Sequence, residues 1–259
     1  MAKDDQLIVR TRINILNVPI DVVTMKEALT VIEGFIADKS SSHLVATANA
    51  EMVMMAQSDK ELANILRQAD LVVPDGAGIV WAARYHGYKM PERVAGFDLA
   101  QAILARAATT GYRIFLLGGA PGIAARAKAV AESRYPGVNI VGTYHGFFQA
   151  ADEAALLADI RARRPDVIFV ALGVPKQEKW LWQHRKELSV PVAIGVGGTF
   201  DVMAGTVRRA PVWMQRAGLE WLYRLMSQPQ RAVRMLALPR FVYRVLTDKK
   251  LDKDDGSIL

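Results

Sequence analysis

The feature that most constrains the fold is an alternation of short apolar runs with Ala-rich segments, which extends from about Val9 to Thr206. The short runs predict strands that are buried on both faces, and the longer Ala-rich segments between them predict helices. Strands that alternate with helices in this way form βα units around a largely parallel sheet. The sequence therefore predicts an α/β fold, a Rossmann-like core with helices on both faces of the sheet.

The pattern places the expected elements as follows. Strands are expected at Ile13–Leu16, Leu44–Ala48, Leu71–Val73, Arg113–Leu117, Asn139–Thr143, Val167–Leu172 and Val192–Val196. Helices are expected at Thr24–Asp38, Glu51–Gln57, Asp59–Ala69, Gly78–His86, Gly96–Thr109, Ile123–Tyr135, Ala151–Arg163 and Lys176–Glu187. Gly, Pro, Asp and Asn residues bound these segments and favour turns and helix caps. No internal repeat or low-complexity linker divides the chain, so the α/β catalytic core is expected to span residues 1–205.

Composition and the first residues exclude several classes of protein. A hydrophobic content of 51% excludes wholesale disorder, and the absence of cysteine excludes disulfides, thiolate catalysis and iron–sulfur clusters. The start from Met1 to Gln6 carries two acids where a signal peptide carries basic residues. The longest apolar runs have the length of strands and fall well short of the roughly 18 residues of a membrane span. We therefore expect a cytoplasmic protein that is neither exported nor inserted into a bilayer.

The net charge of +7 is confined to one segment. Residues Thr206–Thr247 hold eight arginines, no lysine and a single acid, Glu220, so this segment accounts for the whole imbalance. The arginines are Arg208, Arg209, Arg216, Arg224, Arg231, Arg234, Arg240 and Arg244. A guanidinium group is always charged and can bind phosphate through two parallel hydrogen bonds. The segment therefore predicts a partner with phosphate groups or an anionic surface. Residues 248–259 are expected to form a charged tail.

The same segment predicts short amphipathic helices, broken at Pro229 and Pro239 because proline lacks the donor that a helix interior needs. Arg240 and Arg244 lie four residues apart, and therefore on one helical face, with apolar residues beside them. Such a helix binds an anionic membrane surface without spanning the bilayer. We therefore expect a basic helical appendage that places the protein peripherally on the inner face of the plasma membrane.

Candidate site residues follow the predicted strands, because ligands of a parallel sheet bind at the carboxyl ends of its strands. Thr47 ends one strand and offers a hydroxyl to a ligand, whereas Asn49 either contacts the ligand or caps the next helix. Asp75 follows the strand Leu71–Val73. It either caps a turn or acts as a general base that takes the proton from a sugar hydroxyl.

A further loop has the composition of a phosphate-binding loop. Gly118 and Gly119 lead from a predicted strand into an Ala-rich helix, where exposed backbone N–H groups and the helix N-terminus favour an anion. The spacing is not G-x-G-x-x-G, and no acidic residue follows at the distance of a ribose contact. The pattern therefore favours a nucleoside diphosphate over a dinucleotide.

The last two strands are followed by polar residues as well. Gln177 and Glu178 are predicted to hydrogen-bond a uracil or sugar edge, although Glu178 at a helix start also has a simple explanation in the helix dipole. Gly198 allows close approach of the backbone to a ligand, and Asp201 either contacts that ligand or caps a turn.

Metal ligands are not evident in the sequence. The four histidines lack metal-binding spacing. The D-x-D motif at Asp252–Asp254 falls in the charged tail, whereas a metal-dependent nucleotide-sugar site needs it beside a strand end. The sequence therefore predicts no metal ion and no other cofactor.

The chain resembles the WecG/TagA/CpsF family of bacterial glycosyltransferases over essentially Ile13 to Thr247. The resemblance rests on several separated motifs in the right order. These are T-A-N-A-E-M at Thr47–Met52, P-D-G at Pro74–Gly76, L-G-G at Leu117–Gly119, G-V-P-K-Q-E at Gly173–Glu178, G-V-G-G-T-F-D at Gly195–Asp201 and R-A-P-V-W-M-Q-R-A-G-L-E-W-L-Y-R-L at Arg209–Leu225.

The resemblance implies an activity. Members of this family are inverting enzymes that transfer a sugar from a UDP-sugar to a lipid-linked GlcNAc diphosphate at the cytoplasmic face of the membrane. The sequence is most similar to the branch that transfers N-acetylmannosamine to undecaprenyl-diphosphate-GlcNAc in teichoic acid linkage units, and branches that use N-acetylmannosaminuronate or glucose share the motifs. By position, the resemblance implies Asp75 as the base with Thr47 beside it, and Arg224, Arg231 and Arg234 as diphosphate-binding residues.

Two functions of other classes remain open. One is a nucleotide-dependent oxidoreductase that uses the Gly118 loop, and the other is a nucleic-acid-binding module that uses the arginine segment. The aromatic residues of that segment lie at helical core spacing, which argues against stacking on bases, so we expect no nucleic acid as a partner. The exposed apolar face of the appendage also leaves room for a homo-oligomer.

Overall fold

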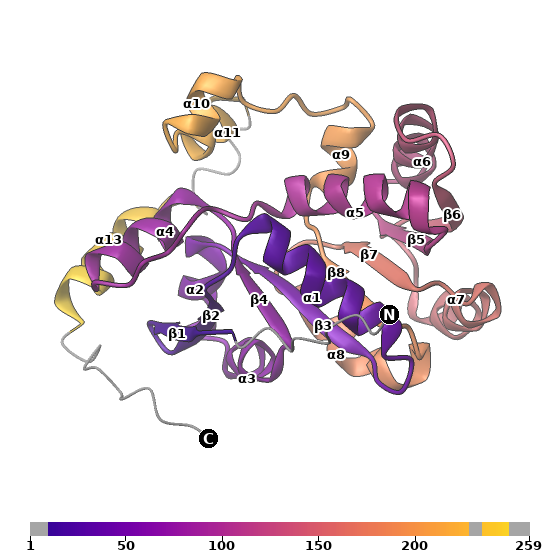
Figure 1. Ribbon diagram of the computed structural model, residues 1–259, viewed down its shortest axis with the longest axis horizontal. Coiled ribbons are helices and arrows are strands. Elements are labelled where there is room, and N and C mark those ends of the chain that lie inside the picture. Colours follow the sequence, from indigo (N-terminus) through magenta and orange to yellow (C-terminus); the bar gives the residue numbers. More distant parts are fainter. Residues whose placement is uncertain (1–9, 228–234, 249–259) are drawn as a thin grey trace, which may run out of the picture.

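A parallel sheet organises the protein, for which a computed structural model describes residues 10–227 and 235–248. Its six strands lie in the order β4-β3-β8-β7-β5-β6 (Figure 1). They are β3 (His43–Ala48), β4 (Leu71–Pro74), β5 (Arg113–Gly118), β6 (Asn139–Tyr144), β7 (Val167–Ala171) and β8 (Val192–Gly195). All the pairings are parallel. The predicted α/β class is confirmed.

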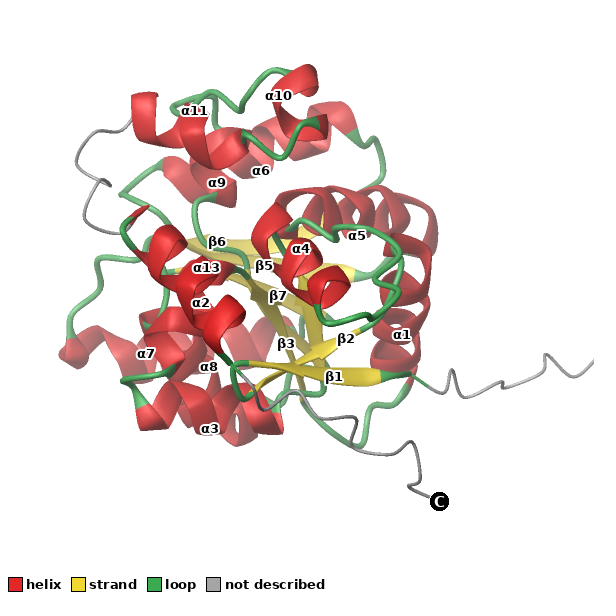
Figure 2. Ribbon diagram, turned by 90° about the vertical axis from the view of Figure 1, so that its left-hand side faces the viewer, coloured by secondary structure: helices red, strands yellow, loops and turns green. Residues whose placement is uncertain are grey.

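Helices cover both faces of this sheet (Figure 2). One face packs against α1 (Met25–Ala37), α5 (Gly96–Thr110), α6 (Ile123–Arg134) and α9 (Thr199–Met203). The other packs against α2 (Ala50–Ala56), α3 (Lys60–Gln68), α7 (Ala150–Arg163) and α8 (Lys176–Leu188), and α4 (Ala77–Tyr85) lies beside them. The predicted core elements begin and end within one residue of these bounds.

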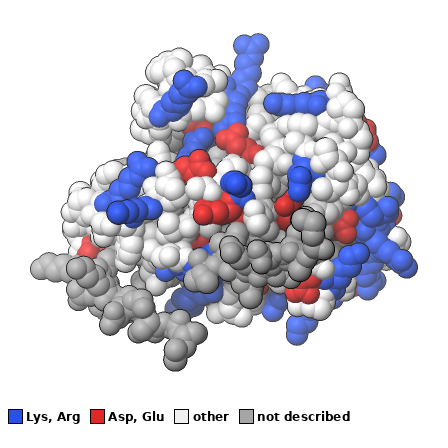
Figure 3. All heavy atoms as spheres, viewed as in Figure 1, with Lys and Arg blue, Asp and Glu red and all other residues white. Residues whose placement is uncertain are grey.

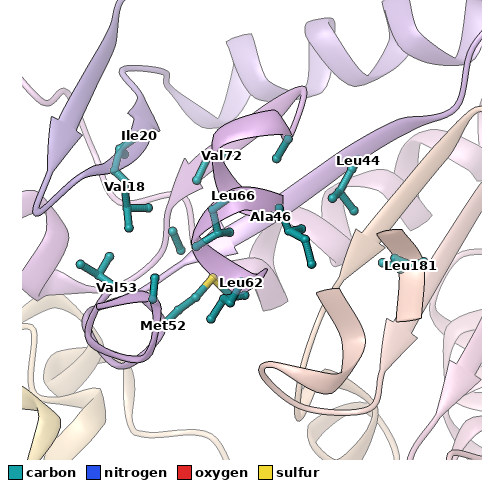
Figure 4. Packing of buried hydrophobic residues seen from close by; sticks show 14 of the residues in the cluster. Val18, Ile20, Leu44, Ala46, Met52, Val53, Leu62, Leu66, Val72 and Leu181 are labelled. Atoms are coloured by element: carbon teal, nitrogen blue, oxygen red, sulfur yellow. The ribbon is translucent and has the colours of Figure 1, made fainter. Parts of the chain in front are cut away.

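The hydrophobic core is divided by the sheet into two clusters. Figure 4 shows the cluster on the side of α2 and α3, where Leu44 and Ala46 of β3 meet Met52 and Leu62 of the helices. Residues of β3, β4, β5, β7 and β8 are buried on both faces, which is why their sequences read as largely continuous apolar runs, whereas the edge strand β6 is only partly buried.

The first predicted strand lies outside this sheet. β1 (Arg12–Ile15) pairs antiparallel with β2 (Val18–Asp21), a strand that the sequence pattern did not predict. The turn between them places Leu16 and Asn17 at positive φ values of 49° and 62°. Such turns usually contain glycine, and leucine rarely adopts this conformation, so the residues of this turn did not indicate a hairpin. Asp21 is buried and accepts hydrogen bonds from Arg12 and from the backbone N–H of Val72, which fixes the hairpin beside β4.

The described part of the appendage after residue 206 consists of short helices joined by turns and loops, as predicted, although Pro239 lies in the first turn of a helix and not at a break. It contains α10 (Val212–Arg216), α11 (Glu220–Ser227) and α13 (Ala237–Thr247). Phe241 and Val245 of α13 are buried against α2 and α4, while the turn before α11 brings Gly218 against Ala77 at the start of α4. The appendage therefore packs beside the loop that carries Asp75. No helix among the described residues is long and apolar enough to cross a bilayer.

Candidate active site at the carboxyl edge of the sheet

Thr47 connects three elements at the carboxyl edge of the sheet. It lies at the end of β3, is buried, and donates a hydrogen bond from Oγ1 to the carbonyl oxygen of Gly195 at the end of β8, at 3.1 Å. Its side chain also packs on Gly96, where an added Cβ would lie 3.1 Å from Thr47 Cγ2. The residue therefore holds β3, β8 and the start of α5 together, directly beside the Asp75 loop.

Asp75 follows β4 and faces the start of α5. Its carboxylate accepts a hydrogen bond from the backbone N–H of Gly96, at the positive end of the helix dipole. Burial raises the pKa of Asp75 above its usual range, while the positive charges of Arg224 and Arg93 and the Gly96 hydrogen bond act in the opposite direction. A carboxylate with a raised pKa is a better proton acceptor than a fully solvated one.

A cluster of arginines lies near the Asp75 loop, and two of them, Arg93 and Arg224, are close enough for their charges to lower the pKa of Asp75. Arg93 precedes α5, Arg209 precedes α10 and Arg224 belongs to α11, and two carboxylates hold them. Glu220 contacts Arg93 and Arg224, each at 3.0 Å, and Asp98 binds Arg209 through two hydrogen bonds of 2.5 and 2.7 Å. Figure 3 shows acidic and basic side chains gathered beneath the lobe that α10 and α11 form. Three guanidinium groups against two carboxylates leave this cluster positive.

The glycine loop after β5 closes one side of a crevice. Gly118 and Gly119 have φ of 135° and 70°, and a Cβ on Gly118 would lie 2.4 Å from the carbonyl oxygen of Ala171. Both positions therefore require glycine. The chain leaves β5 toward β6 but leaves the neighbouring β7 toward β8, and a crevice opens where such connections diverge.

A pocket of about 620 Å³ occupies this crevice. It is lined by Gly119, Ala120, Gly146, Phe147, Phe148, Gln149, Ala171, Leu172, Lys176 and Asp201. Gly119 and Asp201, which the sequence singled out separately, thus share one pocket. Phe147, Phe148 and Lys176 were not predicted. The two phenylalanines lie in the short loop that follows the predicted strand Asn139–Thr143, and that position is the signal that would have found them.

Gln177 and Glu178 are buried behind the loop that follows β8. Gln177 Nε2 donates to Glu178 Oε1 at 2.7 Å, and Gln177 Oε1 accepts from the backbone N–H of Gly197 at 3.0 Å. Glu178 Oε2 has no hydrogen-bond partner in the described part of the chain, and burial raises the pKa of Glu178 to about 7. Contact of either side chain with a nucleotide remains a prediction. The observed hydrogen bonds tie both to the Gly197 loop.

The other predicted residues have these positions. Asn49 caps α2, because its side chain accepts a hydrogen bond from the backbone N–H of Met52 at 2.9 Å. Gly198 precedes α9, next to Asp201. Arg231 and Arg234 lie outside the described residues.

Some charged residues of this edge escaped the sequence interpretation. Arg93 and Asp98 were not predicted at all, and Arg209 and Glu220 entered only in the charge count and in the family motif at Arg209–Leu225. Their partners are far away in the chain, as for Arg93 and Glu220, so no local spacing marks them. Among residues 10–227 and 235–248, no group of three or more His, Asp or Glu side chains is arranged to hold a metal ion.

A crevice at the point where strand connections diverge, with a carboxylate and a positive cluster at the same edge, suits a phosphorylated ligand. A model of the WecG/TagA/CpsF family of glycosyl transferases matches residues 13–255. The N-acetylglucosaminyldiphosphoundecaprenol N-acetyl-beta-D-mannosaminyltransferase of Bacillus subtilis (strain 168) is 34% identical over 237 residues, which cover 92% of this chain and 92% of that protein. The protein of the same name from Staphylococcus aureus (strain MW2) is 32% identical over 240 residues, with coverage of 92% and 94%. The chain therefore belongs to the WecG/TagA/CpsF family and is a glycosyltransferase.

Proposed function

We propose that the protein transfers N-acetylmannosamine from UDP-N-acetylmannosamine to the 4-hydroxyl of undecaprenyl-diphosphate-GlcNAc, with inversion and without a metal ion, in the synthesis of a cell-surface polysaccharide. The names of the relatives support the transferred sugar and the lipid-linked acceptor. The observation that carries the proposal is that Asp75 faces the start of α5 and lies within reach of the charges of Arg93 and of Arg224 from the appendage. A proton acceptor and a group of phosphate-binding cations meet there.

The donor nucleotide fits the pocket between β5 and β7. The backbone N–H groups around Gly118 and Gly119 and the start of α6 favour phosphate. Phe147 lines the same pocket and is 69% exposed, so its ring is free to stack on a base. Asp201 supplies an acceptor for a ribose hydroxyl. Gln177 and Glu178 support this arrangement through Gly197.

The reaction needs a base on one side of the anomeric carbon and charge stabilisation on the other. Asp75 takes the proton of the acceptor hydroxyl as its oxygen forms the bond to the anomeric carbon, and Thr47 holds the adjoining backbone. The bond from the anomeric carbon to the donor phosphate breaks, and its electron pair leaves with UDP. The backbone N–H groups of the Gly118 loop offset the negative charge that develops on the donor diphosphate, and Arg93 and Arg224, on the side of Asp75, bind the diphosphate of the acceptor.

The appendage carries the features of a membrane-docking surface. Trp213 of α10, Met226 of α11 and Tyr243 of α13 are each at least 65% exposed, and Arg240 and Arg244 are exposed on the same helix as Tyr243. Apolar side chains entering the headgroup region and arginines attracted to anionic lipid give reversible binding. This surface would bring the enzyme to an acceptor anchored in the cytoplasmic face of the membrane. The same exposed residues are available for a homo-oligomer.

The test is UDP release from UDP-N-acetylmannosamine with a short-chain lipid diphosphate-GlcNAc acceptor in the presence of EDTA. We expect acceptor-dependent turnover by the wild type and a loss of about 10²–10⁴-fold in folded Asp75→Asn. Asp159→Asn, an exposed change on α7, serves as the matched control. Full turnover by Asp75→Asn would remove Asp75 from the role of base. Absence of turnover with this donor, but not with another UDP-sugar, would correct the sugar.

A further inference from the structure

Glu220 is an acidic residue in a segment that is otherwise basic and that is proposed to bind a negatively charged ligand. It is the single carboxylate between Thr206 and Thr247, and it is buried at the start of α11. If this edge binds a diphosphate, as the proposed function requires, a carboxylate here repels the ligand. Burial of an ionised carboxyl is costly unless it is paired. The structure must therefore gain something specific from it.

The partners of Glu220 come from three separate segments. Oε2 contacts Arg93 Nη1 at 3.0 Å, and Oε1 contacts Arg224 Nη2 at 3.0 Å and Arg209 Nε at 3.5 Å. Arg93 belongs to the core, Arg209 to the connection into the appendage and Arg224 to α11 itself. These arginines hold the pKa of Glu220 below its usual range against the effect of burial. The carboxylate therefore stays ionised and joins the appendage to the core.

We propose that Glu220 is a positioning residue, which holds Arg93 and Arg224 in place beside Asp75. Without it, neighbouring guanidinium groups repel one another, and their long side chains regain the rotamer freedom that the ion pairs remove. Asp98 does not substitute, because its short contacts are to Arg209, and it lies 3.9 Å from Arg93.

The charges around Asp75 make this proposal testable, because it predicts the direction in which the pKa of Asp75 changes when Glu220 is removed. Arg224 and Arg93 lower its pKa, the backbone N–H of Gly96 lowers it further, and Glu220 raises it through the smallest of these effects. If Glu220 positions the arginines, its removal takes away two larger lowering effects together with one smaller raising effect, so the pKa of Asp75 rises. If the arginines keep their places unaided, only the raising effect disappears, and the pKa falls.

The experiment is a titration of the Asp75 carboxyl carbon by NMR in protein labelled with ¹³C-aspartate, with Asp75→Asn to assign the signal. We expect a higher pKa in Glu220→Ala than in the wild type, and a return toward the wild-type value in Glu220→Asp. Glu132→Ala, an exposed change on α6, is the control and leaves the titration unchanged. Glu220→Gln keeps the side-chain volume and takes the place of Glu220→Ala if that variant does not fold. A pKa that falls or stays constant overturns the proposal.

Kinetics provide the second readout. We expect kcat/KM of Glu220→Ala to fall by about 10–100-fold, because misplaced phosphate-binding groups lose much of their effect. The acid limb of its pH profile moves to higher pH. A structural role alone would lower activity without moving that limb. If the wild type transfers no sugar from any donor, the proposed function fails, but the NMR titration still decides whether Glu220 positions the arginines.

Discussion

Glu178 allows a quantitative prediction about stability and pH. Its carboxyl is buried, one oxygen has no partner in the described part of the chain, and burial raises its pKa from 4.5 to about 7. At 1.36 kcal/mol for each pH unit, this rise in pKa means that ionising Glu178 costs about 3 kcal/mol more in the folded protein than in the unfolded chain. Such a cost is a large fraction of the stability of a typical domain.

The direction in which stability changes with pH follows from the number of protons that the folded and unfolded states bind. Between pH 4.5 and about 7 the unfolded chain has lost the proton of Glu178, whereas the folded protein keeps it. The folded state therefore binds more protons in this window, and the free energy of unfolding decreases as the pH rises. Below the window this contribution is absent, and above it the full cost of about 3 kcal/mol applies.

The assay is urea unfolding of the wild type and Glu178→Gln at pH 4.5 and pH 8. Glutamine is neutral at both values and keeps the volume and one acceptor oxygen for Gln177. We therefore expect the variant to gain about 3 kcal/mol relative to the wild type between pH 4.5 and pH 8. Subtracting the two proteins cancels the other titrating groups, and Glu132→Gln on the surface of α6 controls for a generic effect of charge. An equal pH dependence in the wild type and Glu178→Gln would refute the reasoning.

Three further predictions concern the crevice and the appendage. Gly118→Ala should lower the melting temperature and abolish activity, because its Cβ would collide with the carbonyl of Ala171 at a φ that only glycine adopts readily; a wild-type melting curve would contradict this. Phe147→Ala should weaken UDP binding in calorimetry by about 5–100-fold through loss of base stacking, and unchanged affinity would place the base elsewhere. Arg240→Glu with Arg244→Glu should reduce sedimentation with anionic vesicles while turnover of a soluble acceptor persists; equal sedimentation would exclude α13 from docking.

Most of the fold could be predicted because every strand of the parallel sheet except the edge strand β6 is buried on both faces. Runs such as Val167–Ala171 are apolar throughout, so composition alone marks them, and the Ala-rich helices between them fix the class. The second strand of the hairpin, β2, and the short helix α9 were not predicted. Leu16 adopts a positive φ because its side chain is buried and Gln57 donates a hydrogen bond to its carbonyl oxygen at 2.8 Å, a tertiary contact that no local pattern reveals.

The residues of the candidate site also fall into two groups: those whose positions follow from local sequence rules, and those whose positions depend on contacts between distant parts of the chain. Asp75 and Gly119 could be located from sequence because their positions depend on local rules, namely that loops at strand ends face the ligand and that tight turns need glycine. Arg93 and Glu220 could not, because an ion pair between residues so distant in the chain leaves no trace in their spacing. The charge count gave the correct total for the appendage but treated Glu220 as one negative charge among positive ones. Its burial beside Asp75 gives that single acid a specific consequence, since the electrostatics of the proposed base depend on a residue of the appendage as well as on the core.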